Sequence, residues 1–168
     1  ARPGGNAYYR SQDSGVTWTA DGDLDADSVY QLAALSGNLY AATGSGLFRS
    51  ADAGRHWSRL LADAALRIVF HPASPGAFYV SRRSGAPLLK SSDDGNHWQE
   101  IGPSPPAGPL LTALAIDPKP PFALYAAAGR VYRSADGGAT WTASAPLPGL
   151  GAMALAVDSS DSSVVYVS

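Results

Sequence analysis

Apolar residues along the chain come in short runs separated by glycine, proline, serine and aspartate. The runs, such as 39–42, 78–80 and 124–128, have the length of single strands and lack the three-to-four-residue spacing of an amphipathic helix. The pattern predicts an all-β protein of short strands and tight turns. At 168 residues the chain is long enough to bury a core, and we expect a single domain over 1–168.

A short motif, Ser-x-Asp-x-Gly-x-x-Trp, recurs four times, and each of the four tryptophans of the chain closes one copy. Successive copies begin 39, 41 and 43 residues apart. This period fits one four-stranded antiparallel sheet with its turns. The motif residues are Ser11, Asp13, Gly15 and Trp18; Ser50, Asp52, Gly54 and Trp57; Ser91, Asp93, Gly95 and Trp98; and Ser134, Asp136, Gly138 and Trp141.

The strands around the motif repeat as well. An alanine-rich inner strand is followed by a second strand with a tyrosine, a third strand that ends in a basic residue, the motif, and an outer strand. This order predicts a β-propeller with four blades' worth of four-stranded antiparallel sequence. The repeat units cover about 21–60, 61–103 and 104–146, with a split unit formed by 147–168 plus 1–20.

The split unit predicts how the ring of blades closes. Its first two strands come from 147–168 and its third and fourth from 1–20, so we expect the two segments to complete one blade and remove free strand edges, a velcro closure. The repeat is also compatible with part of a larger propeller ring, or with a ring shared by a homodimer.

Each motif residue has a structural role to fill. Serine and aspartate at a turn accept hydrogen bonds from backbone N–H groups two or three residues further on. The common glycine position predicts a positive φ, which glycine adopts without steric cost. The tryptophan begins the outer strand and can cover the loop or a neighbouring sheet with its large apolar face.

These features resemble the Asp-box, or BNR repeat, of β-propellers in the sialidase superfamily, xyloglucanase-like glycoside hydrolases, sortilin-type receptors, and the photosystem II assembly and stability factor family. The base before the motif and the turn sequences at 116–118 and 157–158 are most similar to the last of these and to the xyloglucanase-like repeats. The resemblance covers nearly the whole chain and implies a propeller fold. Because the same repeat occurs in enzymes, receptors and assembly factors, it does not define an activity.

Charge narrows the classes of partner. The formal net charge is −2, from 12 basic and 14 acidic residues, so no strong positive field would attract nucleic acid or an anionic membrane. No apolar run is long enough to insert into a bilayer. The chain has no cysteine, which excludes disulfides and thiolate chemistry. The motifs call for no cofactor, and we expect none.

Candidate catalytic carboxylates are few. A glycoside hydrolase needs two carboxyl groups roughly 5 to 9.5 Å apart, and Asp25 and Asp63 are the candidates. Asp21, Asp23 and Asp25 lie in an acidic loop that would be a calcium candidate, but Ala26 and Leu32 stand where an EF-hand loop needs glycine and glutamate. We interpret this stretch as a solvated loop. The sialidase resemblance also implies a tyrosine activated by a glutamate, and the one glutamate, Glu100, lies in an expected outer strand.

Possible ligand contacts are the recurrent bases and one tyrosine outside the repeating series. The bases recur in every unit, which favours a packing role over an anion site, since binding sites usually break the symmetry of a repeat. Tyr30 could form an aromatic platform. We interpret His71 as a turn residue, and His56 and His97 as exposed side chains before a motif tryptophan. These contact candidates are Arg10, Arg49, Lys90, Arg133 and Tyr30.

The leading functional hypothesis is a non-enzymatic binding or scaffold module that recognises a protein or carbohydrate partner on one face of the ring. A glycoside hydrolase, sialidase-like or xyloglucanase-like, or a non-catalytic fragment of one, is the first alternative. A propeller fragment or engineered repeat without independent function is the second. The resemblance implies an extracytoplasmic location, secreted or periplasmic.

Overall fold

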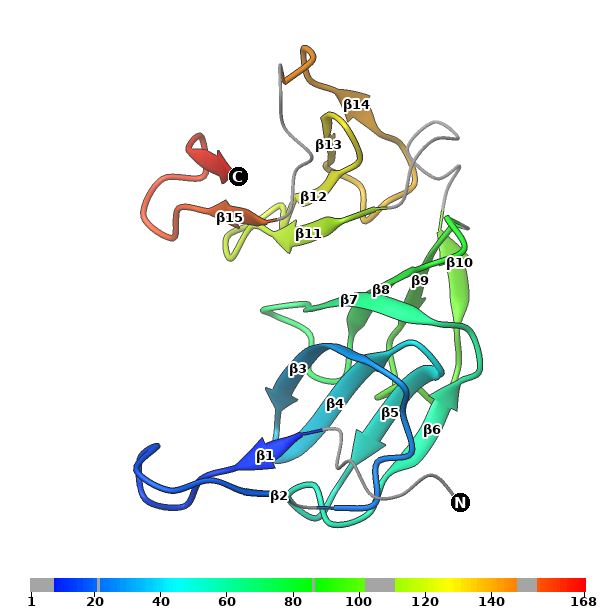
Figure 1. The fold of residues 1–168 in the computed structure, drawn as a ribbon. Helices are drawn as coiled ribbons and strands as arrows, with labels where there is room; N and C mark the ends of the chain where they lie inside the picture. Colours follow the sequence, from blue (N-terminus) through cyan, green and yellow to red (C-terminus); the bar gives the residue numbers. More distant parts are fainter. Residues whose placement is uncertain (1–7, 21, 86, 102–110, 148–153) are drawn as a thin grey trace. The chain divides into compact units, whose positions relative to one another are not determined.

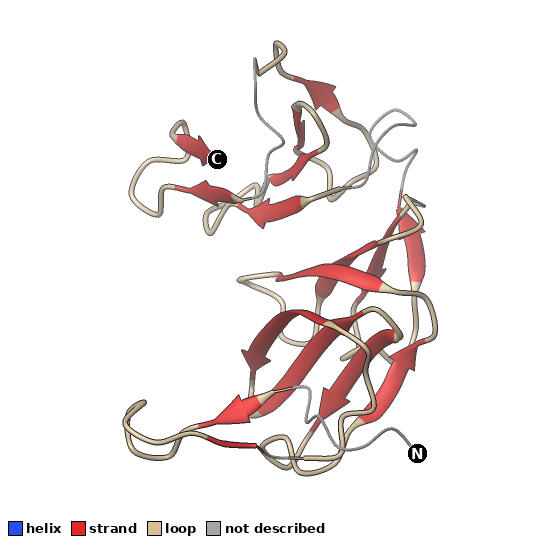
Figure 2. Ribbon diagram, viewed as in Figure 1, coloured by secondary structure: helices blue, strands red, loops and turns tan. Residues whose placement is uncertain are grey.

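The computed structural model describes residues 8–20, 22–85, 87–101, 111–147 and 154–168. These residues form β-strands joined by turns and loops, with no helix among them, as the sequence predicts (Figure 2). In this part of the chain no helix is long and apolar enough to cross a membrane. The chain divides into two compact units, Ala1–Ala65 and Leu66–Ser168.

The described strands include three four-stranded antiparallel sheets, each in sequence order (Figure 1). This is the blade-like architecture that the repeat predicts. The first sheet contains β3 (Val29–Leu35), β4 (Asn38–Thr43), β5 (Gly46–Ser50) and β6 (Ser58–Leu61); the second contains β7 (Ala65–Phe70), β8 (Phe78–Arg82), β9 (Leu88–Ser91) and β10 (Gln99–Ile101); the third contains β11 (Ala113–Ile116), β12 (Leu124–Ala127), β13 (Val131–Ser134) and β14 (Thr142–Ala143).

Two further sheets have two strands each. One pairs β1 (Tyr9–Arg10) with β2 (Thr19–Ala20), and the other pairs β15 (Leu155–Val157) with β16 (Val165–Val167). The sequence predicts that these segments share one blade. That closure, the repeat boundaries and the single domain over 1–168 remain predictions.

The middle strands of each four-stranded sheet are the most buried. All four residues of β12 are buried, as are four of the five in β8, whereas β6 and β14 contain no fully buried residue. Tyr40, Ala41 and Ala42 in β4 have no exposed surface. The apolar runs of the sequence therefore correspond to the centre of each sheet, and the polar outer strands face solvent.

Each compact unit has its own apolar core. In the first unit Tyr8, Leu24, Ala41 and Phe48 form a buried cluster, with Trp57 packed against it. In the second unit one cluster joins residues of β8 to β10 with residues of β12 and β13, among them Tyr79, Ile101, Leu124 and Tyr132. Side chains of two successive sheets thus share a core in that unit.

A side chain caps the turn after three of the inner strands. Asp117 and Asp158 each accept a hydrogen bond at Oδ1 from the backbone N–H two residues further on, at 2.9 and 2.7 Å. His71 occupies the same position, and its Nδ1 accepts from the N–H of Ala73 at 3.3 Å. Burial, with a contribution from the charge of Lys90, lowers the pKa of His71 and favours the neutral imidazole that can accept this bond. His71 is therefore a turn residue, as expected.

Candidate functional site: the motif turns and their depressions

The four motif copies, here called boxes 1 to 4 (11–18, 50–57, 91–98 and 134–141), form the same hydrogen-bonded turn. In each box the serine Oγ accepts from the N–H of the motif glycine at 2.8–2.9 Å and donates to the aspartate Oδ1 at 2.7–2.9 Å. The backbone N–H four residues after the aspartate donates to the same Oδ1 at 2.9 Å. The bonds thus reach two and four residues along the chain, slightly further than the two or three expected.

The motif glycines have the predicted backbone conformation. Their φ angles are 88°, 92°, 88° and 97° in boxes 1 to 4, within the left-handed region that side chains with a Cβ rarely adopt. This conformation directs the glycine N–H to the serine Oγ. The turn therefore depends on serine, aspartate and glycine acting together.

A further member of the turn, the residue four after the aspartate, is absent from the predicted motif. Thr17 and Thr140 donate their hydroxyl to the aspartate Oδ2 at 2.5 and 2.6 Å, and His56 and His97 lie with Nδ1 at 2.5 Å from the same atom. The sequence signal is the restriction of this position to threonine and histidine, two side chains with a donor close to the backbone.

These hydrogen bonds keep the motif aspartates ionised. The hydroxyl and backbone N–H of Thr17 lower the pKa of Asp13 to about 2, and the backbone N–H and ring of His97 lower the pKa of Asp93 to about 2. The pKa values of Asp52 and Asp136 are lowered further, by His56 and by Thr140 respectively. A carboxylate that accepts several hydrogen bonds is a weak base and a poor proton donor at neutral pH.

The motif tryptophans fold back over their turns. The indole N–H of Trp18, Trp57 and Trp141 donates to the carbonyl of its own motif glycine at 3.1, 2.9 and 3.1 Å. Trp98 differs, because its indole nitrogen is buried without a hydrogen-bond partner while its ring meets Phe78 edge-on at 5.3 Å. Trp57 meets Tyr8 in the same manner at 5.6 Å.

The recurrent bases lie across from the recurrent tyrosines. Arg49 pairs with Tyr40, Lys90 with Tyr79 and Arg133 with Tyr125 in the strand register. The Lys90 Nζ lies 5.8 Å from the centre of the Tyr79 ring, and the Arg133 Nε donates to the Tyr125 hydroxyl at 3.2 Å. Cation and ring stabilise one another in this arrangement, which supports the packing role for Lys90 and Arg133. Arg10, in β1, pairs with Thr19 of β2.

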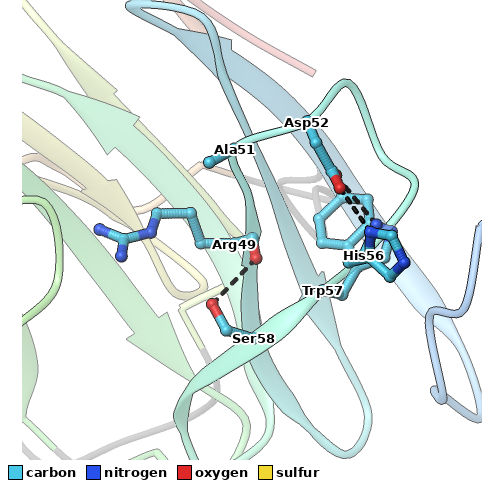
Figure 3. Close-up of a pocket in the computed structure, with 6 residues that line it drawn as sticks. All are labelled: Arg49, Ala51, Asp52, His56, Trp57 and Ser58. Carbon is cyan, nitrogen blue, oxygen red and sulfur yellow. Dashed lines mark hydrogen bonds and ion pairs between the residues drawn. The ribbon is translucent and has the colours of Figure 1, made fainter.

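Boxes 2 and 3 each form one side of a shallow depression. The first has a volume of about 310 Å³ and is lined by Arg49, Ala51, Asp52, His56, Trp57 and Ser58 (Figure 3). The second, of about 230 Å³, is lined by the equivalent residues Lys90, Ser92, Asp93, His97, Trp98 and Gln99. Two sheets thus present the same combination of a base, an aspartate–histidine pair and an indole.

The other predicted site residues lie outside these two depressions. Asp23 accepts the backbone N–H of Trp57 at 3.0 Å, so it supports box 2. Asp25 and Asp63 are exposed, and Tyr30 is half-buried with its hydroxyl near Gly44. Asp21 lies outside the described residues. Among the residues that the structure describes, no three His, Cys, Asp or Glu side chains come together as a metal site.

Comparison with solved structures defines the class of protein, which is a β-propeller-like protein. An ancestral GH74 enzyme matches with a TM-score of 0.76 and 18% identity over 92% of this chain, and the match spans 23% of that enzyme's chain. YCF48 bound to D1 peptide matches with a TM-score of 0.61 and 22% identity, over 82% of this chain and 47% of that one.

An extracellular domain from B. thetaiotaomicron matches with a TM-score of 0.72 and 11% identity, over 91% of this chain and 22% of that one. No protein-family model and no curated protein matches the sequence. At these identities the likeness concerns the fold, which agrees with the glycoside hydrolase and photosystem II assembly factor propellers that the motif resembles.

Proposed function

We propose that this chain is a non-enzymatic binding module that recognises a protein or carbohydrate partner at its motif turns. The observation that carries the proposal is the repetition of one depression in two successive sheets, with a base, an aspartate–histidine pair and a tryptophan at equivalent positions. Rigid hydrogen-bonded turns hold these side chains, and binding residues concentrate on loops that a scaffold fixes in this way.

The state of the carboxylates supports binding over glycoside hydrolysis. A glycosidase needs a general acid whose pKa is raised, so that it holds a proton near neutral pH. The aspartates of boxes 2 and 3 have lowered pKa values, and their carboxylate oxygens accept hydrogen bonds within the turn. Each depression contains a single carboxylate, Asp52 or Asp93.

The fold is compatible with both classes of function. The solved structures of this fold include GH74 enzymes and YCF48 bound to D1 peptide. The choice between an enzymatic and a binding function therefore has to rest on the residues of the site. This chain spans about a quarter of the GH74 enzyme chain. A binding role requires only the surfaces of the motif turns described above. The likeness to an extracellular domain supports the proposal of an extracytoplasmic location.

Binding and hydrolysis measured on the same preparation test the proposal. We expect saturable binding to members of a combined peptide and glycan array, and no release of reducing ends from xyloglucan or sialyl-lactose. Hydrolysis that is abolished by Asp25→Asn or Asp63→Asn would establish the enzyme alternative. Absence of saturable binding across the array would contradict a binding module.

A further inference from the structure

Boxes 2 and 3 differ from boxes 1 and 4 at the position four residues after the motif aspartate. Boxes 1 and 4 have Thr17 and Thr140 there, and boxes 2 and 3 have His56 and His97. All four side chains hydrogen-bond the aspartate Oδ2, and all four backbone N–H groups donate to Oδ1. The threonines show that a hydroxyl is sufficient for the turn. The histidines therefore carry a ring that the turn does not require.

The additional ring atoms face solvent. Nδ1 of His56 forms a hydrogen bond with Asp52, and the second ring nitrogen, Nε2, points away from that carboxylate (Figure 3). The side chains of His56 and His97 are 80% and 90% exposed. Both rings line the depressions of boxes 2 and 3. Each Nε2 is therefore available to a ligand that enters the depression.

The charges in the two depressions favour an acidic ligand. Each is lined in part by a base, Arg49 or Lys90, and by one carboxylate, Asp52 or Asp93, whose two oxygens already accept the hydrogen bonds of the turn. The guanidinium of Arg49 is directed away from the Asp52–His56 pair (Figure 3). A protonated imidazole adds a positive charge beside this carboxylate, with its outer N–H directed to solvent. Carboxylates are strong acceptors for such a charged donor.

For His56 the surrounding charges favour protonation. The hydrogen bond to Asp52 and the charges of Asp52 and Asp23 raise the pKa of His56, while Arg55 opposes them. Arg49 lines the same depression from β5. The positive form of the ring thus persists to a higher pH than in a free histidine.

We propose that boxes 2 and 3 bind carboxylate side chains from an acidic segment of a protein partner, through the Nε2–H groups of His56 and His97. This inference rests on the proposed binding function and names the chemistry of its partner. Lys90, whose Nζ lies over the Tyr79 ring, also lines the box 3 depression, and Arg49 lines the box 2 depression.

The chain supplies the matched variants for the test. His56→Thr and His97→Thr give boxes 2 and 3 the residue that boxes 1 and 4 already use, so the turn retains its donors. The probe is a fluorescein-labelled peptide of alternating glutamate and serine, with the corresponding glutamine peptide as the neutral control. Binding is measured by fluorescence anisotropy at low ionic strength, and circular dichroism follows the fold.

We expect the glutamate peptide to bind more tightly than the glutamine peptide. Each histidine variant should weaken binding about threefold, and the double variant about tenfold, since exposed ion pairs of this kind are individually modest. Binding should weaken as pH rises through the pKa of His56, and this dependence should be reduced in His56→Thr. Thr140→His should strengthen binding by giving box 4 the same ring.

Three results would overturn the inference. The double variant binding the glutamate peptide as tightly as the original chain would show that the histidines are not the contact. A preference for the glutamine peptide would show that the ligand class is wrong. Binding of oligogalacturonate, an acidic polysaccharide added in the same assay, without binding of the glutamate peptide would show the same. The array experiment tests the proposed binding function independently. If other ligands on the array bind the chain, the binding function is supported even when the glutamate peptide does not bind.

Discussion

Box 1 and box 2 contain the same turn in different surroundings. In both, the serine Oγ accepts the glycine N–H at 2.8 Å and the aspartate Oδ1 accepts a backbone N–H at 2.9 Å. Trp18 in box 1 is nevertheless 62% exposed, whereas Trp57 in box 2 is half-buried against Tyr8. The turn therefore forms from its own residues, and tertiary packing is added to it separately.

Tyr8 is the residue that packs against box 2. Its ring meets Trp57 edge-on at 5.6 Å, and its hydroxyl donates to the carbonyl of Gly54. Gly54 is buried, while Gly15, at the same position of box 1, is exposed. Equivalent substitutions in the two boxes separate the cost of the turn itself from the cost of its packing.

The largest expected difference concerns the motif glycine. At Gly54 a Cβ would lie 2.3 Å from the Tyr8 hydroxyl, whereas at Gly15 the nearest atom would be 3.8 Å away. Both positions have a positive φ, so both alanine variants have a strained backbone. We expect Gly15→Ala to lower the free energy of unfolding by about 1 kcal/mol and Gly54→Ala by about 3 kcal/mol.

Urea unfolding followed by circular dichroism measures both values. Gly54→Ala combined with Tyr8→Phe is the control, because it removes the hydroxyl that the new methyl group would meet. Equal losses in the two single variants would show that packing around box 2 adds nothing to the backbone strain.

The tryptophans should show a smaller difference of the same sign. Trp57→Ala removes a half-buried ring and its contact with Tyr8, and we expect a loss of about 2 kcal/mol. Trp18→Ala removes a mostly exposed ring, with an expected loss of less than about 1 kcal/mol. Thermal unfolding by calorimetry provides the comparison, and a larger loss at Trp18 would contradict it.

Acid should affect the two boxes in the same way, because the aspartate hydrogen bonds are local. The folded pKa of Asp13 is lowered from 3.8 to about 2, and that of Asp52 is also lowered. Their contribution to stability is therefore present above the unfolded pKa and is lost as pH falls toward the folded pKa. We expect stability to fall below about pH 4, with a weaker pH dependence in both Asp13→Asn and Asp52→Asn.

Carboxyl carbon shifts from NMR give the pKa of each aspartate directly. A pKa of Asp13 at its ordinary value would mean that the exposed turn does not hold in solution. A lowered pKa at Asp52 alone would show that the ring of His56, and not the turn shared by the two boxes, is responsible.

The sequence predicts the fold well because the repeat is encoded locally. The positive φ of Gly15, Gly54, Gly95 and Gly138 and the capping role of His71 follow from residue type and position. The partner of Trp57 does not follow in this way, because Tyr8 lies 49 residues earlier along the chain. Contacts across such separations depend on how the sheets pack, which no local pattern specifies.

The candidate site was only partly predictable. The recurrent bases were found from the sequence, but their packing on tyrosines depends on strand register. The sequence predicts that His56 and His97 are exposed, which the structure confirms, but it does not predict their bond to the motif aspartate. Comparing threonine with histidine at one position of the repeat could have revealed it. Asp25 and Asp63, chosen for their charge alone, lie outside both depressions.

One tryptophan in each box allows a direct test of the central claim that boxes 2 and 3 bind a partner's carboxylates. The four indole N–H signals in a ¹H–¹⁵N NMR spectrum report on the four boxes separately while the glutamate peptide is added. We predict that the signals of Trp57 and Trp98 shift in a saturable manner while those of Trp18 and Trp141 stay in place. Equal shifts in all four signals, or shifts confined to Trp18 and Trp141, would contradict the account.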